Sequence, residues 1–234
     1  MPSTVGLVAS HYTPKAFTPA DLPNLVGWWD AADAATFTYS SGQEISGWAD
    51  KSGAGRHFTQ AVIAQQPSRT GVQNGQPCIA FNSGVQDTLA SSVSVTQPFT
   101  FFMSSVSYGA GAYLYWWMDG AGGSLFVDSG VGYYLNNVNV GNLNPGMLDA
   151  PVLLTVRVSG GAWYIWRNET LVVGGANAGG AIGNPLYFGF RAGDSRPYAS
   201  FQSNLFEPMI YNRALPDAEC VQVRTYLRAK WGTP

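Results

Sequence analysis

Aromatic side chains at neighbouring positions are the residues of this chain whose type and spacing point most clearly to chemistry. Successive residues of a β-strand face opposite sides of its sheet, so a run of rings must leave some of them outside the core. Exposed Tyr and Trp rings can stack on sugars, and they are also enriched at subunit interfaces. Both roles are open for the rings of three such runs, which are Tyr113, Tyr115, Trp116, Trp117, Tyr133, Tyr134, Trp163, Tyr164 and Trp166.

Catalytic and metal-binding motifs are much weaker in this sequence. His11 and His57 are the only histidines, and neither lies beside a cysteine or a closely spaced set of acids. No G-x-S-x-G motif is present. The glycine pairs at 174–175 and 179–180 lack the lysine of a phosphate-binding loop. We therefore expect no histidine metal cluster, no nucleotide cofactor and no serine nucleophile of this type.

The elements that must position the aromatic runs are β-strands. Short segments rich in aromatic and β-branched residues alternate with Gly, Asn, Asp or Pro, which is typical of sandwiches and barrels. In residues 152–158, Val152, Leu154, Val156 and Val158 alternate with other residues, which predicts a half-buried antiparallel strand. The expected strands are 99–107, 112–118, 125–128, 132–135, 151–158, 162–167, 171–173, 186–190 and 204–211.

The C-terminal segment 216–230 is instead typical of a helix. Pro216 suits the first turn, and Asp217 and Glu219 suit the positive end of the helix dipole. Gly232 is expected to end the helix. Residues at spacings of three and four form an apolar stripe for packing on a sheet, and three basic residues face away from it. The stripe is Cys220, Val223, Leu227 and Trp231, and the basic residues are Arg224, Arg228 and Lys230.

The composition excludes several classes of protein. Of 234 residues, 46% are hydrophobic, 14% are aromatic and only 11% are charged, which is the opposite of the balance found in disordered chains and coiled coils. The net charge is −2 and the basic residues are scattered singly, so nucleic-acid binding is disfavoured. No apolar run approaches the roughly 20 residues of a transmembrane helix.

The first 23 residues differ from the rest. They contain Pro14, Pro19 and Pro23, and we expect an extended arm that precedes one domain spanning residues 24–234. The start of the chain has neither the basic region nor the long apolar stretch of a signal peptide, so we expect synthesis in the cytosol without export. Cys78 and Cys220 lie far apart in sequence, and free thiols are favoured over a disulfide.

Three segments carry a resemblance to a known family. They are LVGWWDAAD at 25–33 with WADKSGAGRH at 48–57, NGQPCIAF at 74–81, and FEPMIYNRAL at 206–215 continuing to Trp231 and Gly232. Together they resemble the concanavalin-A-like, laminin-G-like jelly-roll domain found in phage virion proteins and bacterial surface proteins. The resemblance spans residues 25–232 and implies an all-β, two-sheet antiparallel sandwich with one C-terminal α-helix. Pro216 departs from the family, which often has a capping Ser or Thr at that position.

The resemblance also raises two kinds of chemistry. Laminarinase-type glycosidases of the same superfamily place their carboxylates in an E-x-D-x-x-E pattern, which this sequence lacks. We therefore expect that the chain is not an enzyme. Related jelly rolls often bind calcium, but Asp119, Asp128 and Asp194 are not near neighbours in sequence and suit turn capping better. We expect no cofactor, with a Ca²⁺ ion as the open alternative.

Two functions remain in view. The first is a structural virion protein, a phage capsid decoration, fibre or tail component, that forms a homo-oligomer and docks on other virion proteins through its arm. Its location would be the virion, and analogy with virion fibres suggests a trimer. The alternative is a lectin-like module that binds glycans on a host surface. For a virion-type protein with so little charge, we place the interface role of the aromatic runs ahead of sugar binding.

Overall fold

The computed structural model describes residues 15–82, 85–108, 149–177, 186–189 and 202–234, together with the backbone of the strands between residues 116 and 141. The strands are β1 (Leu25–Trp28), β2 (Phe37–Ser41), β3 (Glu44–Trp48), β4 (Phe58–Thr59), β5 (Ser68–Gln73), β6 (Gln76–Phe81), β7 (Thr88–Ser91), β8 (Phe99–Ser107), β9 (Trp116–Met118), β10 (Leu125–Asp128), β11 (Gly132–Leu135), β12 (Val138–Gly141), β13 (Val152–Ser159), β14 (Ala162–Arg167), β15 (Thr170–Asn177), β16 (Leu186–Gly189), β17 (Ser203–Leu205) and β18 (Met209–Tyr211). The helices are α1 (Asp217–Trp231) and the short 3₁₀ turns η1 (Pro19–Asp21), η2 (Ala34–Thr36) and η3 (Ile63–Gln65).

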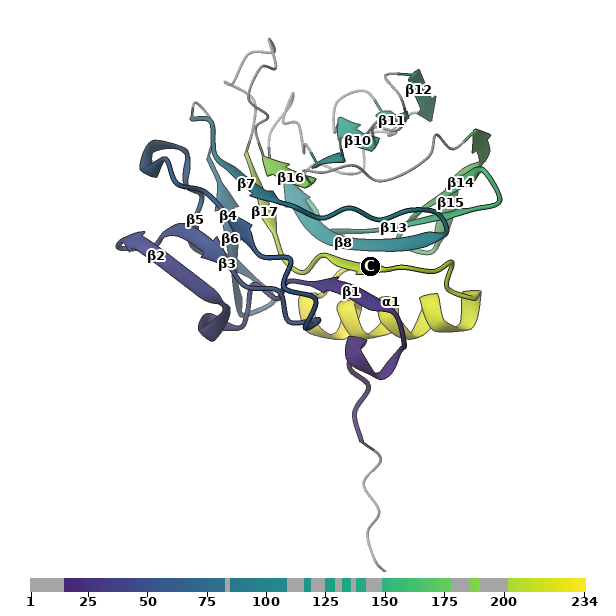
Figure 1. Ribbon diagram of the computed structural model, residues 1–234, viewed down its shortest axis with the longest axis horizontal. Coiled ribbons are helices and arrows are strands. Elements are labelled where there is room, and N and C mark those ends of the chain that lie inside the picture. The colour runs from purple at the N-terminus through teal and green to yellow at the C-terminus, as the bar shows by residue number, and fades with distance from the viewer. Residues whose placement is uncertain are drawn as a thin grey trace, which may run out of the picture.

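These strands form one continuous antiparallel sheet that folds back on itself into two layers (Figure 1). One layer runs β15-β14-β13-β8, and β8 then pairs with β18 near its start and with β17 near its end. The other layer runs β4-β7-β16-β9-β10-β11-β12. The predicted all-β sandwich with a single C-terminal helix is confirmed.

Strand β13 shows how the helix changes the burial of the sheet. Its predicted inward residues, from Val152 to Val158, are all at most 2% exposed. Leu153 and Thr155 point to the opposite face and are nevertheless 0% exposed, since α1 lies across that face (Figure 1). The strand is therefore buried on both faces along most of its length, rather than half-buried as the alternation predicted.

Some predicted strands have the bounds that the sequence indicated, whereas β13 and β16 differ by one residue at one or both ends and β15 is longer than the predicted 171–173. Strands β8, β10, β11 and β14 begin and end at the predicted residues. The expected strand 204–211 is two strands, β17 and β18, with Phe206, Glu207 and Pro208 between them. A proline has no N–H for a sheet, which favours such an interruption. Residues 112–115 of the expected strand 112–118 lie outside the described residues.

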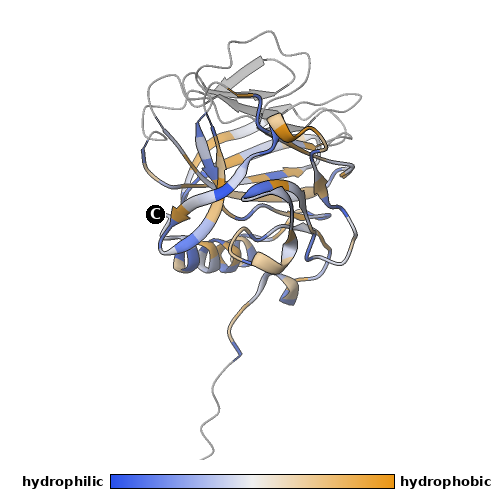
Figure 2. Cartoon of the chain, turned by 90° about the vertical axis from the view of Figure 1, so that its left-hand side faces the viewer, coloured by the Kyte–Doolittle hydropathy of each residue, from blue (hydrophilic) through white to orange (hydrophobic). Residues whose placement is uncertain are grey.

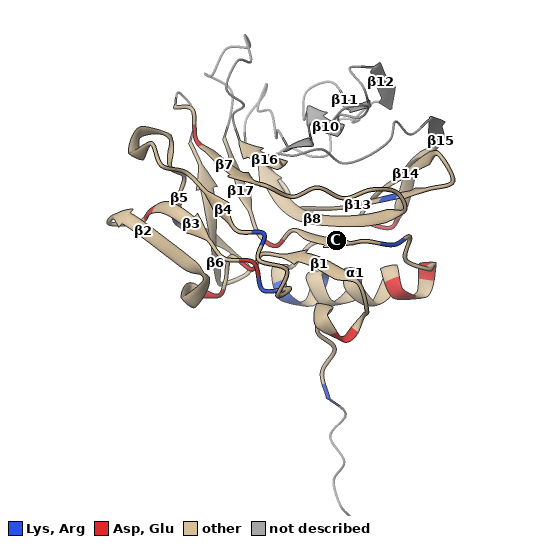
Figure 3. Cartoon of the chain, in the orientation of Figure 1, with Lys and Arg blue, Asp and Glu red and all other residues tan. Residues whose placement is uncertain are grey.

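Helix α1 begins after Pro216 and ends where Gly232 takes a left-handed conformation with φ of 66°. Its predicted apolar stripe is buried at Cys220, Val223, Leu227 and Trp231. The helix is acidic at its first turn and basic at its last, and Figure 3 shows charges gathered at both ends of α1 while most strands carry none. The expectation that the basic residues all face away is wrong for Arg224, which is 7% exposed and pairs with Glu169, and for the half-buried Lys230.

The described part of the N-terminal segment, residues 15–23, contacts the domain. The Tyr211 hydroxyl donates a buried hydrogen bond to the Pro19 carbonyl at 2.9 Å. The ring of Phe17 meets Tyr226 of α1 edge to face, with centroids 6.2 Å apart. Residues 1–14 of the expected arm lie outside the described residues.

The two cysteines are free and buried, as the sequence favoured. Burial raises the pKa of Cys78 to about 12 and that of Cys220 to about 11, so both thiols stay protonated at neutral pH. Hydrophobic residues, orange in Figure 2, lie along the strands of the sandwich. Within the described part of the chain, no helix has the length and apolar character needed to cross a membrane.

One buried carboxylate makes the fold sensitive to pH. Asp87 is 2% exposed, and its Oδ2 accepts hydrogen bonds from the Asn82 backbone and side-chain nitrogens at 2.8 and 3.2 Å. Burial raises the pKa of Asp87 to about 6, and the Asn82 bonds only partly oppose this. The folded state therefore holds this proton more tightly than the unfolded chain, whose aspartates titrate near 3.8. Stability linked to Asp87 is present at low pH and is lost as pH rises through the folded pKa.

We predict that Asp87→Asn gains stability relative to the native chain as pH rises from about 4 to about 7, by roughly 2–3 kcal/mol in total. Asparagine stays uncharged, and its carbonyl can accept both bonds from Asn82. Urea unfolding of both proteins across this pH range measures the difference. All other carboxylates titrate in both proteins, so their contributions to the difference in unfolding free energy cancel. A difference in unfolding free energy that does not change with pH would contradict the prediction.

Candidate functional site

The structure describes the side chains of three of the nine aromatic rings that the sequence singled out. Tyr113 and Tyr115 lie outside the described residues. The other four fall on strands whose backbone alone is described, Trp116 and Trp117 on β9 and Tyr133 and Tyr134 on β11. Trp163, Tyr164 and Trp166 all lie on β14.

The rings of β14 divide between its two faces. Trp163 is 4% exposed and packs edge to face on Phe99 in the core, with centroids 5.7 Å apart. It therefore offers no ring to a ligand or a partner. Tyr164 and Trp166 are half-buried on the other face, where their rings stack with centroids 6.2 Å apart and planes inclined by 28°. We call these two rings the aromatic platform.

Arg157 of β13 completes this site. It lies directly across the sheet from Tyr164, and its guanidinium carbon lies 5.7 Å from the centre of the Tyr164 ring and 4.8 Å from that of Trp166. Its Nη1 donates to the Leu215 carbonyl at 3.1 Å and to Asp217 at 2.6 Å. The cation is thus fixed against both rings by the sheet and by the segment that leads into α1.

A hollow of about 380 Å³ opens beside the platform. This volume lies in the range of small-molecule sites. Its walls come from strands β13 and β14 and from the turn before α1, and the lining residues are Arg157, Ser159, Tyr164, Ala214, Leu215 and Pro216. The hollow therefore joins an aromatic ring, a hydroxyl and a guanidinium.

A larger groove of about 660 Å³ lies on the outer side of α1 next to Phe17. Its other lining residues include Val221, Thr225 and Ala229, so it is mainly apolar. Nothing in the described residues indicates what would cover it, and it joins no set of polar groups suited to a defined ligand.

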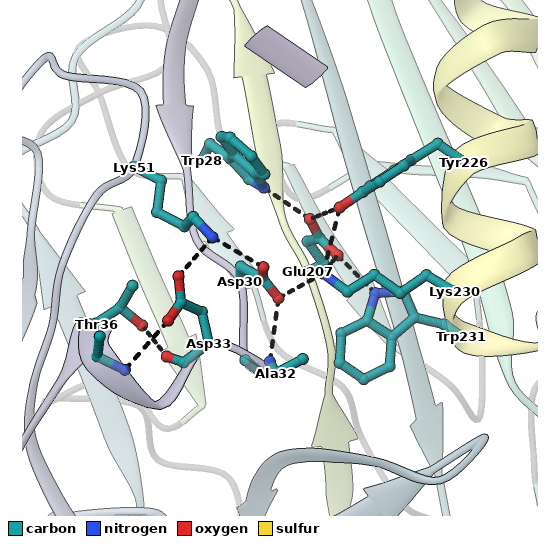
Figure 4. A network of polar contacts seen from close by, with 12 residues as sticks. Trp28, Asp30, Ala32, Asp33, Thr36, Lys51, Glu207, Tyr226, Lys230 and Trp231 are labelled. Atoms are coloured by element: carbon teal, nitrogen blue, oxygen red, sulfur yellow. Dashed lines mark hydrogen bonds and ion pairs between the residues drawn. The ribbon is translucent and has the colours of Figure 1, made fainter. Parts of the chain in front are cut away.

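The densest set of ionisable side chains lies elsewhere, between β1, the β17–β18 connection and α1 (Figure 4). Glu207 is 0% exposed, and all its acceptor sites face donors. Oε1 accepts from Trp28 Nε1 at 2.7 Å and from the Tyr226 hydroxyl at 2.9 Å. Oε2 accepts from Trp231 Nε1 at 2.7 Å and pairs with Lys230 Nζ at 2.7 Å.

The network continues from Lys230 to the segment after β1 (Figure 4). Lys230 also pairs with Asp30 at 2.6 Å, and Lys51 bridges Asp30 and Asp33 at 3.1 and 2.6 Å. The hydrogen bond from Lys51 lowers the pKa of Asp33. Burial alone would lower the pKa of Lys51, but the bonds to the two aspartates outweigh it and raise that pKa.

Glu207 at the centre of this cluster holds the fold together and is not placed to meet a substrate. Burial, together with the nearby Asp30, raises the pKa of Glu207, while Lys230 and Trp28 act in the opposite direction. Every oxygen of Glu207 is occupied inside the protein, and the side chain has no exposed surface. No local pattern in the sequence indicates that the Trp28 indole, 179 residues away, would donate to this carboxylate.

Asp50 organises the neighbouring turn. Its carboxylate accepts from the backbone nitrogens of Ser52 and Arg56 at 2.8 and 3.1 Å, and also from the Trp28 nitrogen at 2.9 Å. Across the described residues, no group of three or more His, Cys, Asp or Glu side chains is arranged to hold a metal ion. Asp119 and Asp194 lie outside the described residues, and Asp128 lies on β10, where only the backbone is described.

No family model and no curated protein matches the sequence. Solved structures do match the fold. A Trypanosoma rangeli sialidase in complex with sialic acid matches with a TM-score of 0.59 and 14% identity, over 86% of this chain and 32% of the sialidase. The binding domain of Paraclostridial Mosquitocidal Protein 1 matches with a TM-score of 0.58 and 13% identity, over 92% of this chain and 56% of that chain. A GH54 α-L-arabinofuranosidase matches with a TM-score of 0.58 and 17% identity, over 80% of this chain and 51% of the arabinofuranosidase chain.

These matches establish the fold and its extent. This chain spans about a third of the sialidase chain and about half of the other two. The sandwich that the resemblance implied is therefore shared with a toxin binding domain, a sialidase and an arabinofuranosidase, whereas the matches lend no support to an origin in a phage virion.

The expectation that the chain is not an enzyme is contradicted, because glycosidases are among the structures with this fold. That expectation depended on the absence of one carboxylate pattern, E-x-D-x-x-E. Glycosidases use several arrangements, and sialidases use a tyrosine as nucleophile, so one missing pattern cannot exclude the class. At this identity the likeness shows the fold, which by itself assigns no activity.

We predict that Glu207→Gln lowers the free energy of unfolding by about 3–5 kcal/mol, because an amide nitrogen would face buried donors and leave Lys230 without its carboxylate. The matched control is Glu169→Gln. Glu169 also pairs with two cations, Arg224 and Arg228, but its side chain is 47% exposed. We expect this control to cost less than Glu207→Gln, because Glu169 itself remains in contact with water although Arg224 is mostly buried. Urea unfolding of the three proteins measures both values, and similar losses in the two variants would refute the structural role of Glu207.

Proposed function

We propose that this chain is a lectin-like carbohydrate-binding module and that the aromatic platform of Tyr164 and Trp166 is its sugar-binding surface. The observation that carries the proposal is the pair of stacked, half-buried rings on the outer face of β14, beside a hollow lined by Arg157 and Ser159. Sugars present apolar C–H faces and a rim of hydroxyls. A site for them therefore needs a flat apolar surface with polar groups at its edge.

The platform has both parts. Two neighbouring rings on one strand face offer a longer apolar surface than one ring would, and the sheet fixes their positions. Because Tyr and Trp side chains have only two rotatable χ angles, they lose little conformational entropy when a ligand binds. The Ser159 hydroxyl lines the hollow beside this surface and the Arg157 guanidinium lies over the two rings, and both can bond to sugar hydroxyls.

The comparisons support binding as the kind of function. One structure with this fold is described as the binding domain of a toxin, and another holds sialic acid in a sialidase. These properties belong to those proteins. For this chain, they make a saccharide a reasonable class of ligand to test first.

The interface role of the same rings is the competing proposal. Under it, Tyr164 and Trp166 would be covered by a second copy, within a homo-oligomer such as the trimer expected for a virion component. A role on a virus particle depends on the sequence resemblance alone. The two proposals differ in what the rings contact, so sizing of the ring variants separates them.

We predict that Trp166→Ala and Tyr164→Ala each weaken glycan binding about tenfold or more, which is a loss of about 1.4 kcal/mol. A glycan array would identify ligands, and calorimetry on the best one would measure affinity. Tyr39→Ala is the matched control, because Tyr39 is another half-buried ring, stacked on Phe37 of β2. Melting curves check that all three variants fold.

Two results would contradict the proposal. One is native protein that binds no glycan on the array. The other is loss of a native oligomer in the Trp166 and Tyr164 variants while glycan binding is unchanged, which would assign the rings to a subunit interface.

A further inference from the structure

We infer that the hollow beside the platform takes a carboxylate, so that the ligand is an acidic saccharide such as one that contains a uronic or sialic acid. This inference rests on the proposed function and names its ligand class. It starts from the charges of the hollow. Arg157 is the only charged residue among those that line it, and no lining residue carries a carboxylate.

The Arg157 guanidinium is already in place before any ligand arrives. The Leu215 carbonyl and the two rings of the platform all contact it, and none of these contacts involves an acid. Its side chain is 20% exposed, so the cation is partly removed from water. A charge in such a place interacts more strongly with a ligand than one in bulk solvent does.

The donors of Arg157 are only partly used. A guanidinium has five N–H donors in a fixed fork, which matches the two oxygens of a carboxylate. Both hydrogen bonds that the structure gives this side chain come from Nη1. Within the described residues, no hydrogen bond reaches Nε or Nη2, which leaves one edge of the fork for a second acceptor.

The acid that now pairs with Arg157 is easy to replace. Asp217 lies 2.6 Å from Nη1, but its side chain is 84% exposed. An ion pair so open to water contributes little, with a typical value of at most about 1 kcal/mol. Asp217 therefore competes only weakly with a ligand carboxylate for the charge of Arg157. The next acid, Glu219, pairs with Arg213 at 2.5 Å and does not compete for Arg157.

The platform and the fork act on different parts of one sugar. Stacking on Tyr164 and Trp166 uses the apolar face, which neutral and acidic sugars share. The fork of Arg157 uses the carboxylate, which only acidic sugars have. Removal of the fork should therefore weaken the binding of acidic sugars more than that of neutral sugars and abolish the preference between them.

The test uses matched pairs of glycans on one array, each an acidic glycan and the same glycan with its carboxylate esterified or removed. We expect native protein to favour the acidic member about tenfold. Arg157→Gln should bring this ratio close to one, with a smaller loss of affinity for the neutral member because Arg157 also bonds to sugar hydroxyls, and Arg157→Lys should retain part of the ratio. Asp217→Asn should raise the ratio, since the competing acid is gone. The preference should also fall with added salt.

Arg228→Gln is the matched control, because Arg228 belongs to α1, is 44% exposed on its side chain and pairs with Glu169. It should leave the ratio unchanged. An Arg157→Gln protein that melts as the native protein does and keeps the acidic preference overturns the inference, as does a selective response to sulfated rather than carboxylated glycans. If no glycan binds at all, the proposed function itself fails.

Discussion

The buried carboxylate of Glu207 is the interaction on which the rest of the structure depends. It lies at the break between β17 and β18, and its four partners come from β1 and α1. An uncompensated charge in this position would cost several kcal/mol, so the chain can bury Glu207 only when both elements are docked. The network therefore makes the position of the helix a condition of folding and joins the two ends of the domain.

The candidate site depends on the same docking at the opposite end of α1. The turn before the helix supplies Leu215, whose carbonyl holds Arg157, and it supplies Pro216 as one wall of the hollow. Strands β13 and β14 supply Arg157, Ser159 and the two rings of the platform. The site is thus built where a helix meets a sheet, and the salt-bridged network some turns away keeps that helix from shifting. A rigid frame of this kind lets a shallow site hold its groups in place before a ligand arrives.

The sequence predicted the frame better than the site because the two depend on different information. Alternation and turn residues act locally, so strands such as β8 and β14 and the apolar stripe of α1 could be read directly. The site depends on contacts between distant residues. Nothing local indicates that Arg157 would lie over Tyr164 and Trp166, or that Lys230 would turn inward to Glu207. Trp163 shows the limit well, since alternation says that one ring of the run is buried but not which.

The fold itself leaves function open, since one sandwich occurs in a sialidase, a toxin binding domain and an arabinofuranosidase. What distinguishes this chain is where its few charges lie. Most of the described strands carry none (Figure 3). Lys51 and Lys230 are each paired with two carboxylates of the Glu207 network. Arg157 instead lines a hollow, lies over two rings and has one carboxylate partner, which is 84% exposed, so it is the cation that this structure offers for recognition.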